Sequence, residues 1–265
     1  MSLETITLVQ FDSSIGPAED GTLERMCAHI RAADVDLIVF PELATTGYSI
    51  FDQIEKCAEP IPGPTTRILG QAAAESNTHV LLGMPVQGQN RVHNSAIWID
   101  RQGKVRIQYD KRQLWGDECN VFTPGEDLVV VDCEGLSVGI QICYDLNFPE
   151  QAAAFARAEV DLLVNISAWS EPMKGDWDRL LPARAIETGA FVLGCNHAGD
   201  EGDLMFYGHS TVYNPDGSVN RRLKNEPDAI TWQFEEKLLT QERKRNPMRE
   251  DRREDGPGIE RIQVE

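Results

Sequence analysis

Short apolar runs and amphipathic segments alternate along most of the chain, and this alternation predicts its secondary structure. Apolar residues at helical spacing predict helices, and short runs that are apolar on one or both faces predict strands. The predicted strands are residues 6–10, 37–40, 80–84, 93–100, 104–109, 128–132, 136–142, 162–166, 191–195, 210–214 and 230–234. The predicted helices are residues 23–33, 64–76, 149–158, 176–188 and 235–245. Helices between strands, mixed with hairpins such as the one around residues 101–103, indicate an α/β layered fold with mixed sheets.

The strand predicted at residues 136–142 has two different faces and ends at a cysteine. Its even positions are all apolar, whereas its odd positions are small or polar and continue to Cys143. Period-two alternation therefore places this thiol on the polar face. Pro149 then opens an alanine-rich helix, since proline is favoured at the first helical position. A nucleophile is often held at such a strand-to-helix bend, so Cys143 is the leading candidate for a catalytic residue.

At 265 residues the chain is long for one domain and short for two. No linker, low-complexity stretch or internal repeat divides it, so we predict a single domain over residues 1–240. Residues 241–265 form a charged tail that is too polar to have a core of its own. A solvated tail is one interpretation of this segment; our hypothesis is that it lies across a neighbouring subunit.

Several classes of protein are disfavoured by composition. Net charge is −18, from 43 acidic and 25 basic residues, whereas a nucleic-acid partner requires a basic face. No apolar run approaches the ~20 residues of a membrane span, and the first residues lack the features of a signal peptide. The six cysteines and five histidines show no metal-ligand spacing. We therefore expect a cytoplasmic protein with no nucleic-acid or membrane partner and no metal.

Two charged residues elsewhere could assist the thiol. Glu42 follows the strand at 37–40, where a buried carboxylate is costly unless it is paired or used. Lys111 follows the strand at 104–109 and, in a pocket with carboxylates, could stabilise a developing oxyanion. Each residue alone has an ordinary interpretation as a surface charge.

Together these residues resemble the carbon–nitrogen hydrolase family, also called the nitrilase superfamily, over roughly residues 5–255. The three motifs that carry the resemblance are Phe40-Pro41-Glu42-Leu43, Asp110-Lys111-Arg112-Gln113-Leu114 and Ile142-Cys143-Tyr144-Asp145-Leu146-Asn147-Phe148-Pro149-Glu150. The resemblance implies a four-layer αββα sandwich with two mixed sheets. It also implies a homodimer or higher homo-oligomer and a catalytic triad of Glu42, Lys111 and Cys143. Many members have a second glutamate seven residues after the lysine, which falls here on Glu118.

The resemblance further implies a thioester mechanism that needs no cofactor. Glu42 acts as the base, Lys111 and the backbone N–H of Tyr144 hold the oxyanion, and Glu118 positions the substrate and Lys111. We expect Tyr48 and Trp169 to line the substrate site, and Trp177 to belong to the core. Asn147 departs from the family pattern, because arginine often stands at that position.

The residues after Cys143 are more similar to the amidase and carbamoylase branches than to true nitrilases. We therefore predict hydrolysis of a small carboxamide to ammonia and a carboxylic acid. Hydrolysis of an N-carbamoyl amine or amino acid, or of a nitrile, is the alternative with the same triad. A papain-like site would instead pair Cys143 with His197 or His209 and with Asn196. A binding or scaffold protein would have an unreactive Cys143.

Overall fold

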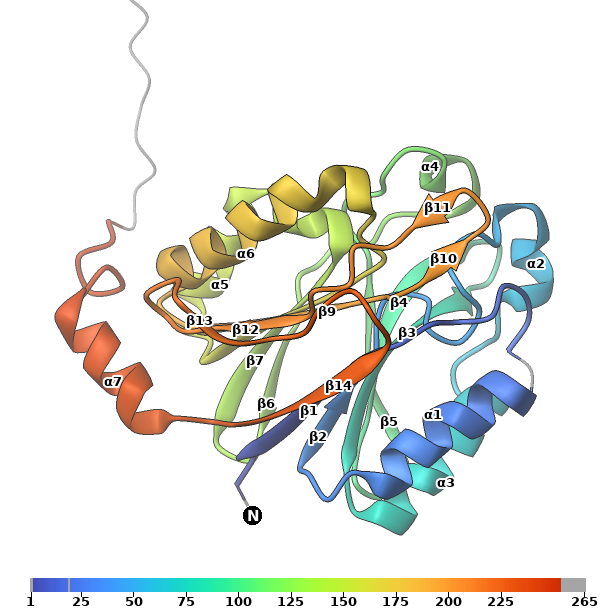
Figure 1. The fold of residues 1–265 in the computed structure, drawn as a ribbon, viewed down its shortest axis with the longest axis horizontal. Helices are drawn as coiled ribbons and strands as arrows, with labels where there is room; N and C mark the ends of the chain where they lie inside the picture. Colours follow the sequence, from blue (N-terminus) through green and yellow to red (C-terminus); the bar gives the residue numbers. More distant parts are fainter. Residues whose placement is uncertain (1, 19, 254–265) are drawn as a thin grey trace, which may run out of the picture.

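The computed structural model describes residues 2–18 and 20–253. Two six-stranded sheets lie face to face between two pairs of helices (Figure 1). The first sheet has the order β14-β1-β2-β3-β4-β5. Its strands are β14 (Asp228–Gln233), β1 (Thr5–Gln10), β2 (Leu37–Val39), β3 (His79–Gln87), β4 (Val92–Ile99) and β5 (Val105–Asp110). The second sheet has the order β13-β12-β9-β8-β7-β6. Its strands are β13 (Val219–Arg222), β12 (Thr211–Tyr213), β9 (Phe191–Asn196), β8 (Leu162–Ser167), β7 (Leu136–Ile142) and β6 (Val130–Cys133).

Helices cover the outer face of each sheet. Helices α1 (Asp20–Ala32) and α3 (Pro64–Ser76) pack on the first sheet. Helices α5 (Pro149–Arg157) and α6 (Lys174–Thr188) pack on the second. A third apolar core fills the space between the sheets, with residues such as Leu8 and Ile140 contributed by the two sides. The predicted four-layer αββα sandwich is therefore confirmed.

Both sheets are mixed. The parallel pairs β1–β2, β2–β3, β7–β8 and β8–β9 form the middle of the sheets, and antiparallel strands lie at their edges. The central strands are buried on both faces, which explains their continuous apolar sequences. Because parallel strands end at the same edge, the segments after β2, β7 and β8 meet at one edge of the sandwich.

Several short elements were not predicted from the sequence. They are the helices α2 (Ile54–Cys57) and α4 (Glu118–Val121), the strands β10 (Asp200–Glu201), β11 (Leu204–Met205) and β13, and three 3₁₀ turns at Phe51–Gln53, Cys143–Asn147 and Glu171–Met173. One turn of helix or two residues of strand is too short to show a period. Among the described residues, no helix combines the length and apolarity needed to cross a bilayer.

The C-terminal segment packs on its own chain as far as it is described. Helix α7 (Glu236–Arg245) buries Leu239 against the core between the sheets. Arg243 donates to Asp161 at 2.9 Å and to the carbonyl oxygen of Gly189 at 3.0 Å. Residues 254–265 of the predicted tail lie outside the described residues, and its packing on a partner subunit stays a prediction.

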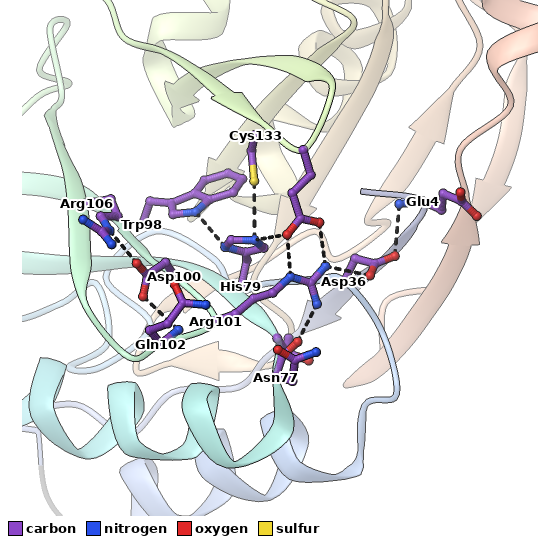
Figure 2. A network of polar contacts seen from close by, with 12 residues as sticks. Glu4, Asp36, Asn77, His79, Trp98, Asp100, Arg101, Gln102, Arg106 and Cys133 are labelled. Atoms are coloured by element: carbon purple, nitrogen blue, oxygen red, sulfur yellow. Dashed lines mark hydrogen bonds and ion pairs between the residues drawn. The ribbon is translucent and has the colours of Figure 1, made fainter. Parts of the chain in front are cut away.

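A polar network joins the two sheets at the edge where the parallel strands begin (Figure 2). Arg101, after β4, donates through Nη2 to Asp36 Oδ1 at 2.7 Å, just before β2. The same guanidinium donates to both carboxylate oxygens of Glu134, each at 2.8 Å, in the turn between β6 and β7. Next to it, His79 Nε2 lies 3.3 Å from Glu134 Oε1 and 3.4 Å from the sulfur of Cys133. One buried arginine thus ties the first sheet to the second.

Candidate active site

Lys111 lies fully buried between two carboxylates at the edge where β2 and β7 end. Its Nζ donates to Glu42 Oε1 and to Glu118 Oε1, each at 2.7 Å. The three residues come from different elements: the loop after β2, the end of β5 and the start of α4. The structure therefore brings together three of the predicted site residues with none of their charged atoms exposed.

The carboxylate of Glu42 is held at both oxygens. Besides Lys111, the amide Nδ2 of Asn94 on β4 donates to Oε1 at 2.7 Å. The backbone N–H of Ala168, after β8, donates to Oε2 at 2.8 Å. These bonds fix the orientation of the side chain, as a general base requires. Asn94 is a site residue that the sequence analysis missed, because a lone asparagine in a predicted strand carries no signal of its partner.

Glu118 is held in a similar way. The hydroxyl of Tyr48 donates to Oε1 at 2.9 Å, and the backbone N–H of Trp115 donates to Oε2 at 3.0 Å. Burial raises the pKa of Glu118, and the adjacent Lys111 ammonium lowers it. Glu118 thus braces the lysine from the side opposite Glu42.

Cys143 stands at a strained bend directly after β7. Its φ of 46° lies in the left-handed region, which is uncommon for a residue with a side chain. The 3₁₀ turn Cys143–Asn147 begins there and leads into α5. A nucleophile on a sharp strand-to-helix turn has this backbone geometry, and strain of this kind is concentrated at functional sites. The residue as a whole is half-buried.

The charged cluster acts directly on this thiol. Burial is the main cause that raises the pKa of Cys143 well above its usual value, and the Glu42 carboxylate raises it further. The Lys111 ammonium opposes this shift. Burial alone would lower the pKa of Lys111, but Glu118 and Glu42 raise it, so the lysine stays charged. Burial and Glu42 thus disfavour the thiolate, so Cys143 needs a base to become a nucleophile.

Asp145 fixes the bend from beneath. Its Oδ2 accepts from the backbone N–H of Ile142 at 3.0 Å and from the hydroxyl of Tyr109 at 2.6 Å. Its Oδ1 accepts from the backbone N–H of Gln113, two residues after Lys111, at 2.9 Å. This buried carboxylate couples the nucleophile turn to the lysine loop. Its role was not apparent from sequence, because the motif shows the residue but not its hydrogen-bond partners.

A pocket opens above Cys143. The residues that line it are Tyr48, Trp115, Cys143, Tyr144, Asn147, Ala168, Trp169, Ser170 and Met173. The predicted lining residues Tyr48, Tyr144 and Trp169 are among them. Trp115 was not anticipated, because the chain around α4 gives no periodic signal. Trp177 is fully buried and packs against Trp169 with ring centroids 5.5 Å apart, as expected for a core residue.

The histidines considered for a papain-like site have other partners. His197 Nε2 lies 2.6 Å from the backbone carbonyl oxygen of Glu42, and His197 Nδ1 lies 3.1 Å from that of Phe11. His209 stacks on Tyr207 with ring centroids 4.1 Å apart. The structure therefore gives neither imidazole the role of base for Cys143. In the described part of the chain, no group of three or more His, Cys, Asp and Glu side chains is arranged to hold a metal ion.

Residues 5–252 match the carbon-nitrogen hydrolase family. The chain belongs to this family. This carbon-nitrogen hydrolase is 34% identical over 221 residues to the (R)-stereoselective amidase of a Pseudomonas species, covering 83% of this chain and 79% of the relative.

Solved structures agree with this assignment. XC1258 from Xanthomonas campestris, a CN-hydrolase superfamily protein with an arsenic adduct in its active site, has a TM-score of 0.87 and 26% identity over 97% of this chain and 100% of its own. A mutant amidase from Nesterenkonia sp. AN1 carries the acetamide moiety of fluoroacetamide covalently at its active-site cysteine. It has a TM-score of 0.79 and 27% identity over 94% of this chain and 97% of its own. The protein is thus a carbon–nitrogen hydrolase enzyme, with amidases among its relatives.

Proposed function

We propose that this enzyme hydrolyses a small carboxamide through a thioester on Cys143, releasing ammonia and a carboxylic acid. The observation that carries the proposal is the buried ion cluster. Lys111 is shared by Glu42 and Glu118 at 2.7 Å each, and the charges of all three act on the Cys143 thiol. A nucleophile, a base and a fixed cation are the groups that acyl transfer requires.

The first half of the reaction forms the thioester. Glu42 accepts the proton of the Cys143 thiol as the sulfur attacks the amide carbon. The ammonium of Lys111 and the backbone N–H of Tyr144 stabilise the negative charge that develops on the carbonyl oxygen. Glu42 then gives its proton to the nitrogen, the C–N bond breaks and ammonia leaves.

The second half releases the acid. Glu42, again a carboxylate, takes a proton from water as the water oxygen attacks the thioester carbon. The tetrahedral intermediate is stabilised as before, the C–S bond breaks, and the proton on Glu42 returns to the sulfur. Glu118 keeps Lys111 charged and in position throughout. The covalent acetamide on the cysteine of the Nesterenkonia amidase supports a covalent route, and the amidase relative supports an amide substrate.

An ammonia-release assay tests the proposal. Butyramide, an N-carbamoyl amine and butyronitrile are compared on wild type, Cys143→Ala and Glu42→Gln, with Cys119→Ala as a matched control at an exposed cysteine. We expect release from butyramide by wild type and the control, and a loss of at least about 1,000-fold in both site variants. Ammonia release from the nitrile or the carbamoyl compound, without release from the amide, would contradict the proposed carboxamide substrate and indicate the other substrate class instead. Full activity in Cys143→Ala would contradict the mechanism.

We also propose that the enzyme forms a homodimer or a higher homo-oligomer, with the C-terminal segment contributing to the contact. Light scattering compares the full chain with a chain that ends at Thr240. A smaller assembly for the shortened chain supports the proposal, and an unchanged dimer contradicts the role of the segment.

A further inference from the structure

The pocket above Cys143 is walled by apolar and neutral side chains. Five of its lining residues, Tyr48, Trp115, Tyr144, Trp169 and Met173, present aromatic rings or a thioether. The polar side chains among the lining residues are uncharged apart from any thiolate on Cys143. A group that enters this pocket therefore leaves water for an apolar surface with few polar partners.

The charges just behind the pocket wall are mostly negative. Glu42 and Glu118 together outnumber the ammonium of Lys111, which is fully buried between them. Glu201 accepts from the backbone N–H of Tyr48 at 3.0 Å, and Asp145 lies beneath the Cys143 turn. A carboxylate on the substrate would thus be desolvated next to charges of its own sign, which is strongly unfavourable.

The nearby cations are already engaged. Arg184 is not among the lining residues; it donates to the backbone carbonyl oxygen of Leu146 at 2.9 Å and pairs with Glu187 at 2.7 Å. Lys174, next to Met173 at the rim, is exposed and paired with Glu171. Within residues 2–18 and 20–253, no lysine or arginine is among the residues that line the pocket.

Asn147 is the lining residue at which a substitution could change the balance of charge around the pocket. Its Oδ1 is buried without a hydrogen-bond partner, so a substitution would break no hydrogen bond at this atom. An amide at this position is neutral and gives a bound carboxylate no compensating charge.

We propose, on the basis of the proposed function, that the pocket selects carboxamides with an uncharged acyl group and rejects those whose acyl group carries a carboxylate. Succinamide and succinamate are a matched pair for the test, because they have nearly the same shape and differ by one charge. We expect kcat/KM to be at least about 100-fold higher for succinamide, as expected for desolvating an unpaired carboxylate. Equal rates, or faster hydrolysis of succinamate, would overturn the proposal.

A charge variant locates the effect. Asn147→Arg should narrow the succinamide-to-succinamate ratio by at least about 10-fold, because it supplies a cation inside the pocket. Gln102→Arg adds the same charge on the exposed turn after β4, at the opposite edge of the sandwich, and should leave the ratio unchanged. If both variants changed the succinamide-to-succinamate ratio equally, the preference would come from the net charge of the chain. That result would contradict selection by the pocket.

Binding to Cys143→Ala separates this proposal from the proposed function. Isothermal titration of this variant with the two compounds reports pocket preference without turnover. Binding of succinamide that is at least about 10-fold tighter supports selection by charge, whether or not wild type hydrolyses the compounds. If wild type hydrolyses neither compound, that result contradicts only the proposed function. If succinamide binds no more tightly than succinamate, the proposed selection is overturned, even if wild type hydrolyses both compounds.

Discussion

The imidazole of His197 lies 2.6 Å, through Nε2, from the backbone carbonyl oxygen of Glu42. Nδ1 of the same ring lies 3.1 Å from the backbone carbonyl oxygen of Phe11, so both ring nitrogens face carbonyl acceptors. His197 follows β9 in the second sheet, and Glu42 follows β2 in the first. The ring is fully buried and stacks on Phe206 with centroids 5.0 Å apart. One imidazole thus positions the backbone of the proposed base from the opposite sheet.

Replacing His197 should impair catalysis through Glu42. We expect His197→Leu to lower kcat by about 10-fold or more with a smaller effect on KM, since a small displacement of a base slows proton transfer. It should also lower the free energy of unfolding by about 1–3 kcal/mol, because the carbonyl oxygen of Glu42 is left unpaired. Steady-state kinetics and urea unfolding measure the two effects. His197→Asn keeps an N–H donor and should recover part of kcat; equal kcat in the two variants would argue against positioning.

Lys111 should stabilise the folded protein as well as the transition state. Lys111→Met leaves Glu42 and Glu118 buried without their cation, so we expect a loss of about 3–5 kcal/mol in unfolding free energy and no measurable turnover. Adding Glu118→Gln removes one of the unpaired charges and should restore part of the stability but no activity. Urea unfolding of the two variants checks this. A double variant less stable than Lys111→Met would show that the carboxylates are not the cause.

The Arg101 network should affect stability without affecting the reaction. Arg101 is 6% exposed and joins Asp36 to Glu134 at the edge opposite the active site. Arg101→Met should lower the unfolding free energy by about 2–4 kcal/mol, while kcat of the folded enzyme stays within about 2-fold. Arg106→Met is the matched control, because Arg106 is exposed and its partner Asp100 belongs to the same sheet, so this variant should lose less stability than Arg101→Met. Similar losses in both variants would contradict a link between the sheets.

The thiol of Cys133 predicts a stability change in alkaline solution. Burial, with a smaller effect of Glu134, raises its pKa from 9.0 to about 11. Because the folded-state pKa is the higher one, the contribution to stability is fully present below pH 9 and is lost as the pH rises through 11. The loss amounts to about 1.4 kcal/mol by pH 10. Between pH 8 and 10, the unfolding free energy should therefore fall less for Cys133→Ala than for wild type, and the difference between the two decreases should equal this loss. Parallel curves for the two proteins would contradict it, and Cys119→Ala serves as the exposed control.

Much of the fold could be predicted because it is encoded locally. The helix Pro64–Ser76 and the strand Leu136–Ile142 have the predicted bounds, since proline, apolar period and turn residues mark their ends within a few positions. The order of strands and helices and the α/β layering follow from the same local signals. The resemblance of three motifs to the carbon–nitrogen hydrolase family also selected Glu42, Lys111 and Cys143 as the residues to look for.

The tertiary structure alone decided how those residues are held and what surrounds them. Asn94 and Ala168 orient Glu42 across 52 and 126 positions of chain, and His197 supports it across 155. The left-handed bend at Cys143 and the neutral lining of the pocket also appear only when strands from both sheets end at one edge. Periodicity and motifs report on neighbours along the chain, whereas hydrogen-bond partners and local charge depend on which distant segments pack together. The sequence by itself therefore determined the elements and the reactive groups, and the packing of the two sheets determined their geometry and the charge of the pocket.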